Sequence, residues 1–154
     1  MKLYLVQHAK AASNDVDSAR SLTDEGRRDI QKVATFLEPL KLKVDYLWHS
    51  GKKRAEQTAE ILAGAVKVKN EMAIREGLAP NDDITIIKDK VVKIQSDIMI
   101  VGHMPFVSKL ASLLLTDSQS PAVIAFKQGG VVCLEYTDLN QWQVAWMITP
   151  ELFE

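Results

Sequence analysis

The chain has few of the features of a secreted, disulfide-bonded or membrane-spanning protein. Its single cysteine, Cys133, cannot form an internal disulfide, and it lies in the apolar run 131–134, which predicts a core side chain. The apolar start at 1–6 is too short for a secretory signal, and no later run approaches the length that a bilayer requires. We therefore expect a cytoplasmic protein.

The sequence also lacks a substantial net charge. Its 19 basic and 20 acidic residues leave a formal charge of -1, so no overall field would attract nucleic acid or an anionic membrane, and any site for a charged ligand must be local. No His-x-His, Cys-x-x-Cys or closely spaced carboxylate set is present to bind a metal. We expect neither a metal nor an organic cofactor.

Apolar residues make up 47% of the 154 residues, which is enough for one domain over 1–154 with its own core. Strands and helices alternate through most of the chain, and the pattern then changes to strands alone. Strands are expected at 3–6, 44–48, 66–68, 97–101, 122–126, 131–136 and 142–148, and helices at 23–38, 55–63, 84–94 and 105–115. This order predicts a three-layer α/β/α sandwich around a mixed, mostly parallel central sheet, with an antiparallel edge formed by the last three strands.

Three loops with chemically useful side chains each follow a predicted strand. The first loop carries His8, the second runs from Ser50 to Arg54, and the third carries His103. The carboxyl ends of such strands meet at one edge of a sheet, where ligands bind. A neutral imidazole can attack phosphorus while cations hold the phosphate oxygens, and a guanidinium such as that of Arg54 binds two of them at once. The three loops therefore predict phosphoryl transfer.

In these segments the chain resembles the histidine phosphatase superfamily, which is phosphoglycerate mutase-like in fold, and in particular its SixA-type phosphohistidine phosphatases. The resemblance runs almost end to end and depends on the order and spacing of several short motifs. These are Leu3-Tyr4-Leu5-Val6-Gln7-His8, Arg20-Ser21-Leu22-Thr23-Asp24-Glu25-Gly26, Ser50 followed by Arg54-Ala55-Glu56-Gln57-Thr58, and Gly102-His103.

The resemblance implies a role for each matching residue. His8 would be transiently phosphorylated, while Arg54, Arg20 and His103 would contact the phosphate. Glu76 falls where larger relatives place a proton donor, and Asp82 is a second candidate for that role. The implied substrate is a phosphorylated protein, most simply one that bears phosphohistidine, and a small phosphorylated metabolite is the alternative.

Two residues depart from the family pattern. Gln7 stands where the superfamily has arginine, so it can donate an N–H to phosphate but brings no charge, and Ala9 replaces a glycine. Lys10, Lys52 and Arg20 are available to compensate, although Lys52 and Lys53 together are typical of a solvated surface pair. A phosphate-binding module that lost turnover with Gln7 is therefore a second hypothesis. His49 matches no motif and is interpreted as structural.

Overall fold

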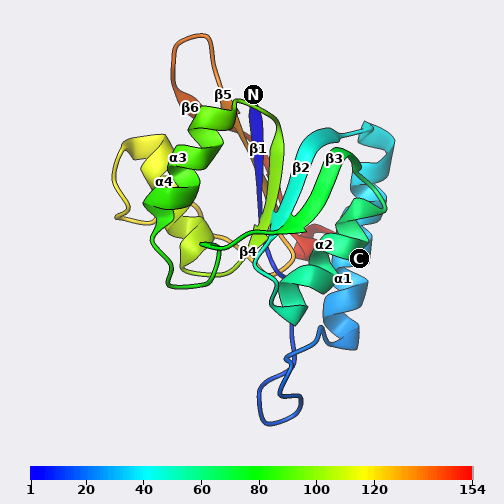
Figure 1. The fold of residues 1–154 in the computed structure, drawn as a ribbon. Helices are drawn as coiled ribbons and strands as arrows, with labels where there is room; N and C mark the ends of the chain where they lie inside the picture. The colour runs from blue at the N-terminus through cyan, green and yellow to red at the C-terminus, as the bar shows by residue number, and fades with distance from the viewer. Residues whose placement is uncertain (154) are drawn as a thin grey trace.

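A six-stranded mixed sheet forms the middle layer of the protein (Figure 1). The computed structural model describes residues 1–153, and its strands lie in the order β3-β2-β4-β1-β5-β6. Their bounds are β1 Lys2–Gln7, β2 Lys43–His49, β3 Lys67–Ile74, β4 Ile98–Gly102, β5 Val131–Tyr136 and β6 Trp142–Ile148. The pairs β3-β2, β2-β4 and β4-β1 are parallel, whereas β1-β5 and β5-β6 are antiparallel.

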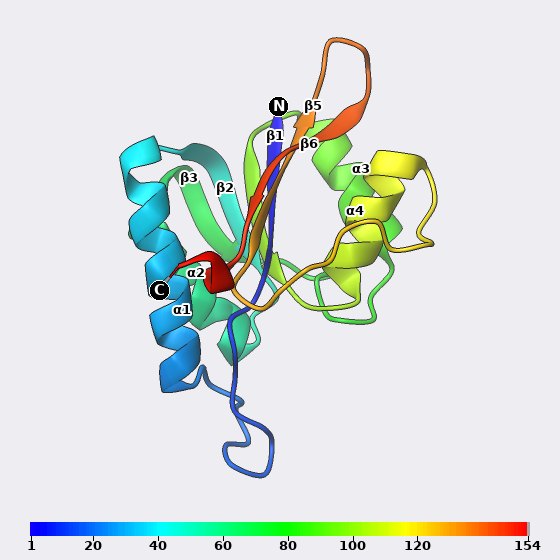
Figure 2. The same ribbon diagram turned by 180° about the vertical axis from the view of Figure 1, so that it is seen from behind.

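Helices cover both faces of this sheet, which confirms the predicted three layers. The helices are α1 (Asp24–Leu37), α2 (Lys53–Ala63), α3 (Ile84–Ile94) and α4 (Phe106–Thr116), with short 3-10 turns at Glu38–Leu40 and Pro150–Leu152. Helices α1 and α2 lie on one face, and α3 and α4 lie on the other (Figures 1 and 2). None of the helices in the part of the chain described here is long and apolar enough to cross a membrane.

The central strands contribute to a separate core on each face of the sheet. In β1, Tyr4 and Val6 pack in the core beneath α1 and α2, while Leu3 and Leu5 pack in the core beneath α3 and α4. Burial on both faces explains why β1 and β4 appear in the sequence as unbroken apolar runs. Cys133 lies fully buried in β5, as predicted.

Two segments differ from the sequence-based expectation. The segment Ala122–Phe126 is not a strand, and β6 is the last strand on that side of the sheet. Its Ile124 and Phe126 instead pack as irregular chain against the core beneath α3 and α4. Strand β3 extends well beyond the predicted 66–68. The sequence pattern did not show its full length, because β3 is the outermost strand of the sheet, with mostly exposed side chains and an irregular register with β2. Neither feature leaves a clear alternation in the sequence.

Parallel pairing brings three carboxyl ends to one edge of the sheet. Gln7 at the end of β1 pairs with Gly102 at the end of β4, and His49 at the end of β2 pairs with Val101. The chain between β1 and α1 leaves from this same edge and projects away from the sheet (Figure 1). The loops predicted to converge therefore emerge side by side.

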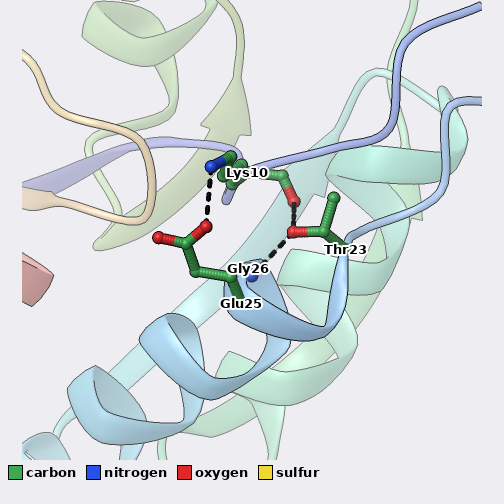
Figure 3. Close-up of polar contacts among 4 residues, drawn as sticks. All are labelled: Lys10, Thr23, Glu25 and Gly26. Carbon is green, nitrogen blue, oxygen red and sulfur yellow. Dashed lines mark hydrogen bonds and ion pairs between the residues drawn. The ribbon is translucent and has the colours of Figure 1, made fainter.

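The start of α1 is joined to the segment that follows β1 (Figure 3). The Lys10 carbonyl accepts hydrogen bonds from the backbone N–H of Thr23 at 3.0 Å and from its hydroxyl at 3.3 Å. The same hydroxyl caps the helix by accepting the N–H of Gly26 at 2.9 Å, and the Lys10 ammonium pairs with Glu25 at 2.6 Å. A Cβ atom at Gly26 would lie 2.1 Å from the Lys10 carbonyl oxygen, so only glycine fits there.

We predict that Gly26→Ala destabilises the protein by about 1–3 kcal/mol, because the added methyl group must displace the backbone of Lys10. Thermal unfolding followed by circular dichroism measures the effect. Gly64→Ala is the matched control, since Gly64 has a right-handed helical backbone and its nearest atom is 3.3 Å from the added Cβ. Equal melting temperatures for the two variants would contradict the close approach.

Candidate active site

His8 lies directly after β1 with only 7% of its surface exposed. Its backbone N–H donates to the Gly102 carbonyl at 3.0 Å, which continues the pairing of β1 with β4. Its ring Nδ1 lies 2.7 Å from the Ala9 carbonyl oxygen. A carbonyl oxygen can only accept, so Nδ1 carries the proton and Nε2 keeps its lone pair. Burial lowers the pKa of His8, and the charges of Arg54 and Arg20 lower it further against the opposing effect of the Ala9 hydrogen bond. The imidazole is therefore neutral at neutral pH.

His103 follows β4, and its ring centroid lies 5.1 Å from that of His8. The side chain is 1% exposed. Its Nε2 lies 2.6 Å from the Ser50 hydroxyl, while its buried Nδ1 has no partner among residues 1–153. Burial lowers the pKa of His103 to about 3, and the charges of His8, Arg54, Lys52 and Arg20 act in the same direction. When Ser50 donates to Nε2, the proton of this neutral ring lies on Nδ1, where an anion could accept it.

Two arginines lie near the imidazole pair. Arg54 is in the first turn of α2, and its buried Nε has no hydrogen-bond partner in the described chain. Burial lowers the pKa of Arg54, and the charge of Arg20 lowers it further, so the two guanidinium groups repel each other. Two cations that repel each other favour an anion in this place.

Arg20 is positioned by the loop between β1 and α1. The Asp17 carboxylate accepts the N–H groups of Ala19 and Ser21, and the Arg20 Nε donates to the Ala12 carbonyl at 3.1 Å. Arg20 itself has a φ of 52°, a left-handed conformation that non-glycine residues seldom adopt. The loop therefore holds Arg20 in a specific backbone conformation beside the site.

The sequence comparison decides the family of this chain. Residues 3–80, which include His8, Arg20, Arg54 and Glu76, match the family described as "Histidine phosphatase superfamily (branch 1)". The chain belongs to the histidine phosphatase superfamily.

Known proteins similar to this superfamily member include phosphatases of different substrates. The chain is 21% identical to phosphohistidine phosphatase SixA of Escherichia coli over 97% of this chain and 94% of SixA. A structure of the protein histidine phosphatase SixA complexed with tungstate has a TM-score of 0.86 at 20% identity, over 99% of both chains. A mutant phosphoserine phosphatase from Entamoeba histolytica in complex with phosphoserine has a TM-score of 0.71 at 15% identity, over 97% of this chain and 98% of that one. These structural likenesses establish the shared fold.

The two departures from the superfamily pattern lie on either side of His8. Gln7 is partly buried, and strand alternation places it on the same sheet face as Leu5, next to Gly102. Ala9 is fully buried and is not among the non-glycine residues with positive φ in the described chain. An alanine therefore fits the backbone beside His8 without strain, and the other departure, Gln7, brings no charge.

Neither candidate proton donor forms a side-chain hydrogen bond with a histidine within residues 1–153. Glu76 is exposed and follows the carboxyl end of β3. The backbone N–H of Arg75 still donates to the carbonyl of His49 at 2.9 Å, so Glu76 lies on the side of the sheet where the strands' carboxyl ends carry the site. Asp82 is also exposed, and its carboxylate accepts the backbone N–H of Ala79 at 2.9 Å. Asp82 is thus occupied in shaping its own loop, whereas no hydrogen bond of the Glu76 carboxylate is recorded in residues 1–153.

The supporting role of Thr58 and Gln57 was not expected from the sequence. The Thr58 hydroxyl accepts the Ala9 N–H at 3.0 Å and donates to the Arg54 carbonyl at 2.8 Å. The Gln57 side-chain oxygen accepts the Leu22 N–H at 2.8 Å. Both residues belong to the motif that follows Ser50, and their spacing from Arg54 places them within one turn of the same helix. This helical spacing was the signal in the sequence from which their position beside Arg54 could have been predicted.

No cluster of three or more His, Cys, Asp or Glu side chains that could hold a metal ion is found in residues 1–153.

His49 lies at the end of β2, 4% exposed, and its Nδ1 accepts the Gly51 N–H at 3.1 Å. This bond shapes the turn after β2, which agrees with a structural interpretation of His49.

We predict that acid destabilises the fold through His103. Its folded-state pKa of about 3 lies below the ordinary 6.5, so the unfolded chain binds a proton first, and stability is lost as the pH falls from 6.5 toward 3. The loss due to this one residue should be about 1.5 kcal/mol between pH 6.5 and 5. Urea unfolding of the wild type and of His103→Gln across this pH range measures it. Parallel stability curves for the two proteins would contradict the prediction.

Proposed function

We propose that this superfamily member is a phosphatase that hydrolyses protein phosphohistidine through a phosphohistidine intermediate on its own His8. The observation that carries the proposal is the 2.7 Å hydrogen bond from His8 Nδ1 to the Ala9 carbonyl, because it leaves Nε2 of a neutral ring free to attack. The similarity to SixA, a phosphohistidine phosphatase, supports the choice of substrate.

The reaction has two steps. In the first, Nε2 of His8 forms a bond to phosphorus while the bond from phosphorus to the leaving group breaks. In the second, water attacks the phosphorus of the intermediate, the P–N bond to His8 breaks, and inorganic phosphate leaves. Charge on the transferred phosphoryl oxygens is then stabilised by Arg54, Arg20 and the Nδ1–H of His103, with Gln7 donating a neutral hydrogen bond.

Glu76 is the proposed proton donor to the leaving group, in preference to Asp82, because the Asp82 carboxylate is already bonded to Ala79. The P–N bond of phosphohistidine is weak, and its imidazole departs with little acid assistance. An alkoxide leaving group needs protonation, so the contribution of Glu76 depends on the substrate.

We predict that His8→Asn lowers turnover of an aryl phosphate by roughly a thousandfold or more, because the attacking nitrogen is removed. Wild-type protein quenched during turnover should carry an acid-labile phosphoryl label, and the variant should carry none. His49→Gln, a change at a second buried histidine, should retain the label. A chelator should leave the wild-type rate unchanged. An equally labelled His8→Asn protein would refute the assignment.

We predict that Glu76→Gln lowers hydrolysis of an alkyl phosphate such as phosphoserine by roughly a hundredfold, but that of a phosphohistidine protein by less than about fivefold. Steady-state rates on both substrates measure the difference. Asp82→Asn is the matched control and should change neither rate by more than about twofold if its carboxylate only shapes the loop. The roles are reversed if Asp82→Asn shows the substrate-dependent loss. A wild type that prefers small phosphate esters over every phosphohistidine protein tested would favour the metabolite alternative.

A further inference from the structure

The neutral side chain of Gln7 leaves the phosphate site with one positive charge fewer than the superfamily pattern supplies. Charge-assisted hydrogen bonds to phosphate are substantially stronger than neutral ones. Three nearby cations could compensate: Lys10, Arg20 and Lys52. The structure distinguishes between them by what each one already contacts.

We propose that Lys52 binds the phosphate oxygens through its ammonium group and supplies the positive charge that Gln7 does not. The proposal rests on the proposed function, because it assigns a further residue to the same phosphate site. It also separates Lys52 from its neighbour Lys53, which the sequence alone groups with it as a surface pair.

The backbone of Lys52 belongs to the hydrogen-bond network of the site. Lys52 is the N-cap residue of α2 and lies between Ser50 and Arg54. Its N–H donates to the Ser50 hydroxyl at 3.3 Å, and that hydroxyl lies 2.6 Å from Nε2 of His103. The first turn of the same helix carries Arg54, whose buried Nε is unpartnered in the described chain. The backbone of Lys52 is therefore linked to the His103 ring through a chain of two hydrogen bonds, and its side chain starts from this position.

The ammonium of Lys52 is available to a ligand. The residue is exposed, and no carboxylate within residues 1–153 forms a salt bridge with it. Its charge is one of those that lower the pKa of His103, so the ammonium lies within electrostatic range of that ring, although it is not among the charges that act on His8. A lysine on its flexible four-carbon stem can bring a compact charge to a phosphate oxygen without a fixed geometry.

The other candidates are already engaged. Lys10 pairs with Glu25 of α1 at 2.6 Å (Figure 3). Lys53 pairs with Glu56 at 3.5 Å along the helix. Neither lysine is among the charges that act on His8 or His103. Arg20 is already counted in the site and donates its Nε to Ala12. Lys52 is the cation of this group that remains without a protein partner in the described chain.

The test is a comparison of phosphate affinities, which does not depend on turnover. Calorimetric titration with inorganic phosphate is done on the wild type, Lys52→Ala, Lys53→Ala, Lys52→Arg, Gln7→Arg and the double variant Gln7→Arg with Lys52→Ala. Lys52→Ala should weaken binding about tenfold, while Lys53→Ala should stay within about twofold of the wild type and Lys52→Arg should keep most of the affinity. Equal melting temperatures establish that the variants are folded.

The double variant tests the compensation itself. Gln7→Arg should restore phosphate affinity in the Lys52→Ala background to within about threefold of the wild type, and it should improve the wild type by a smaller factor, because the two cations serve the same oxygens. Three results would overturn the proposal: Lys52→Ala binds phosphate as the wild type does, Lys53→Ala loses as much as Lys52→Ala, or Gln7→Arg gives the same factor in both backgrounds. Failure of the proposed function has a different signature, namely a wild type that binds phosphate but forms no phosphoenzyme.

Discussion

The chemistry of the site depends on one short hydrogen bond, from Nδ1 of His8 to the carbonyl of Ala9 at 2.7 Å. It selects the tautomer in which Nε2 is free, and a doubly protonated ring would have no lone pair with which to attack phosphorus. Ala9 is itself held by the Thr58 hydroxyl, which also bonds to the carbonyl of Arg54. The same side chain thus holds both Ala9, whose carbonyl orients the His8 ring, and the helical turn that carries Arg54. Their relative geometry is set by the scaffold before any ligand arrives.

The site gathers positive charge that an anion would neutralise. Two guanidinium groups lie near two buried imidazoles, and the pKa values of both imidazoles are lowered, so the rings stay neutral and do not add to the repulsion. The buried Nε of Arg54 and the buried Nδ1 of His103 have no hydrogen-bond partner in the described chain. Unpaired donors and a left-handed Arg20 are destabilising features in a free protein, and such features gather where a ligand is bound.

Most of the fold follows from local sequence patterns, and the exceptions have identifiable causes. Burial on both faces gives β1 an unbroken apolar run, so this strand is evident from the sequence. Helix α3 was predicted at 84–94 and has these limits in the structure. The segment 122–126 has strand-like side chains, but whether it pairs depends on which strands already occupy the sheet, and local sequence does not contain that information. The convergence of His8, His103 and Arg54 follows from strand order. The link through Thr58 and the different environments of Lys52 and Lys53 depend on side-chain geometry, which spacing alone does not determine.

The nature of the leaving group connects the remaining features of the site. An alkyl phosphate requires a firmly placed acid and strong charge stabilisation, because its oxygen leaves as a poor leaving group. In this chain the residue at position 7 is neutral, and the candidate acid Glu76 is exposed just beyond an edge strand. A proton donor that is not firmly placed weakens catalysis on an ester more than catalysis on a P–N bond, whose imidazole leaves readily. Under the proposed function, a protein-borne phosphohistidine would therefore be the substrate that depends least on the placement of Glu76.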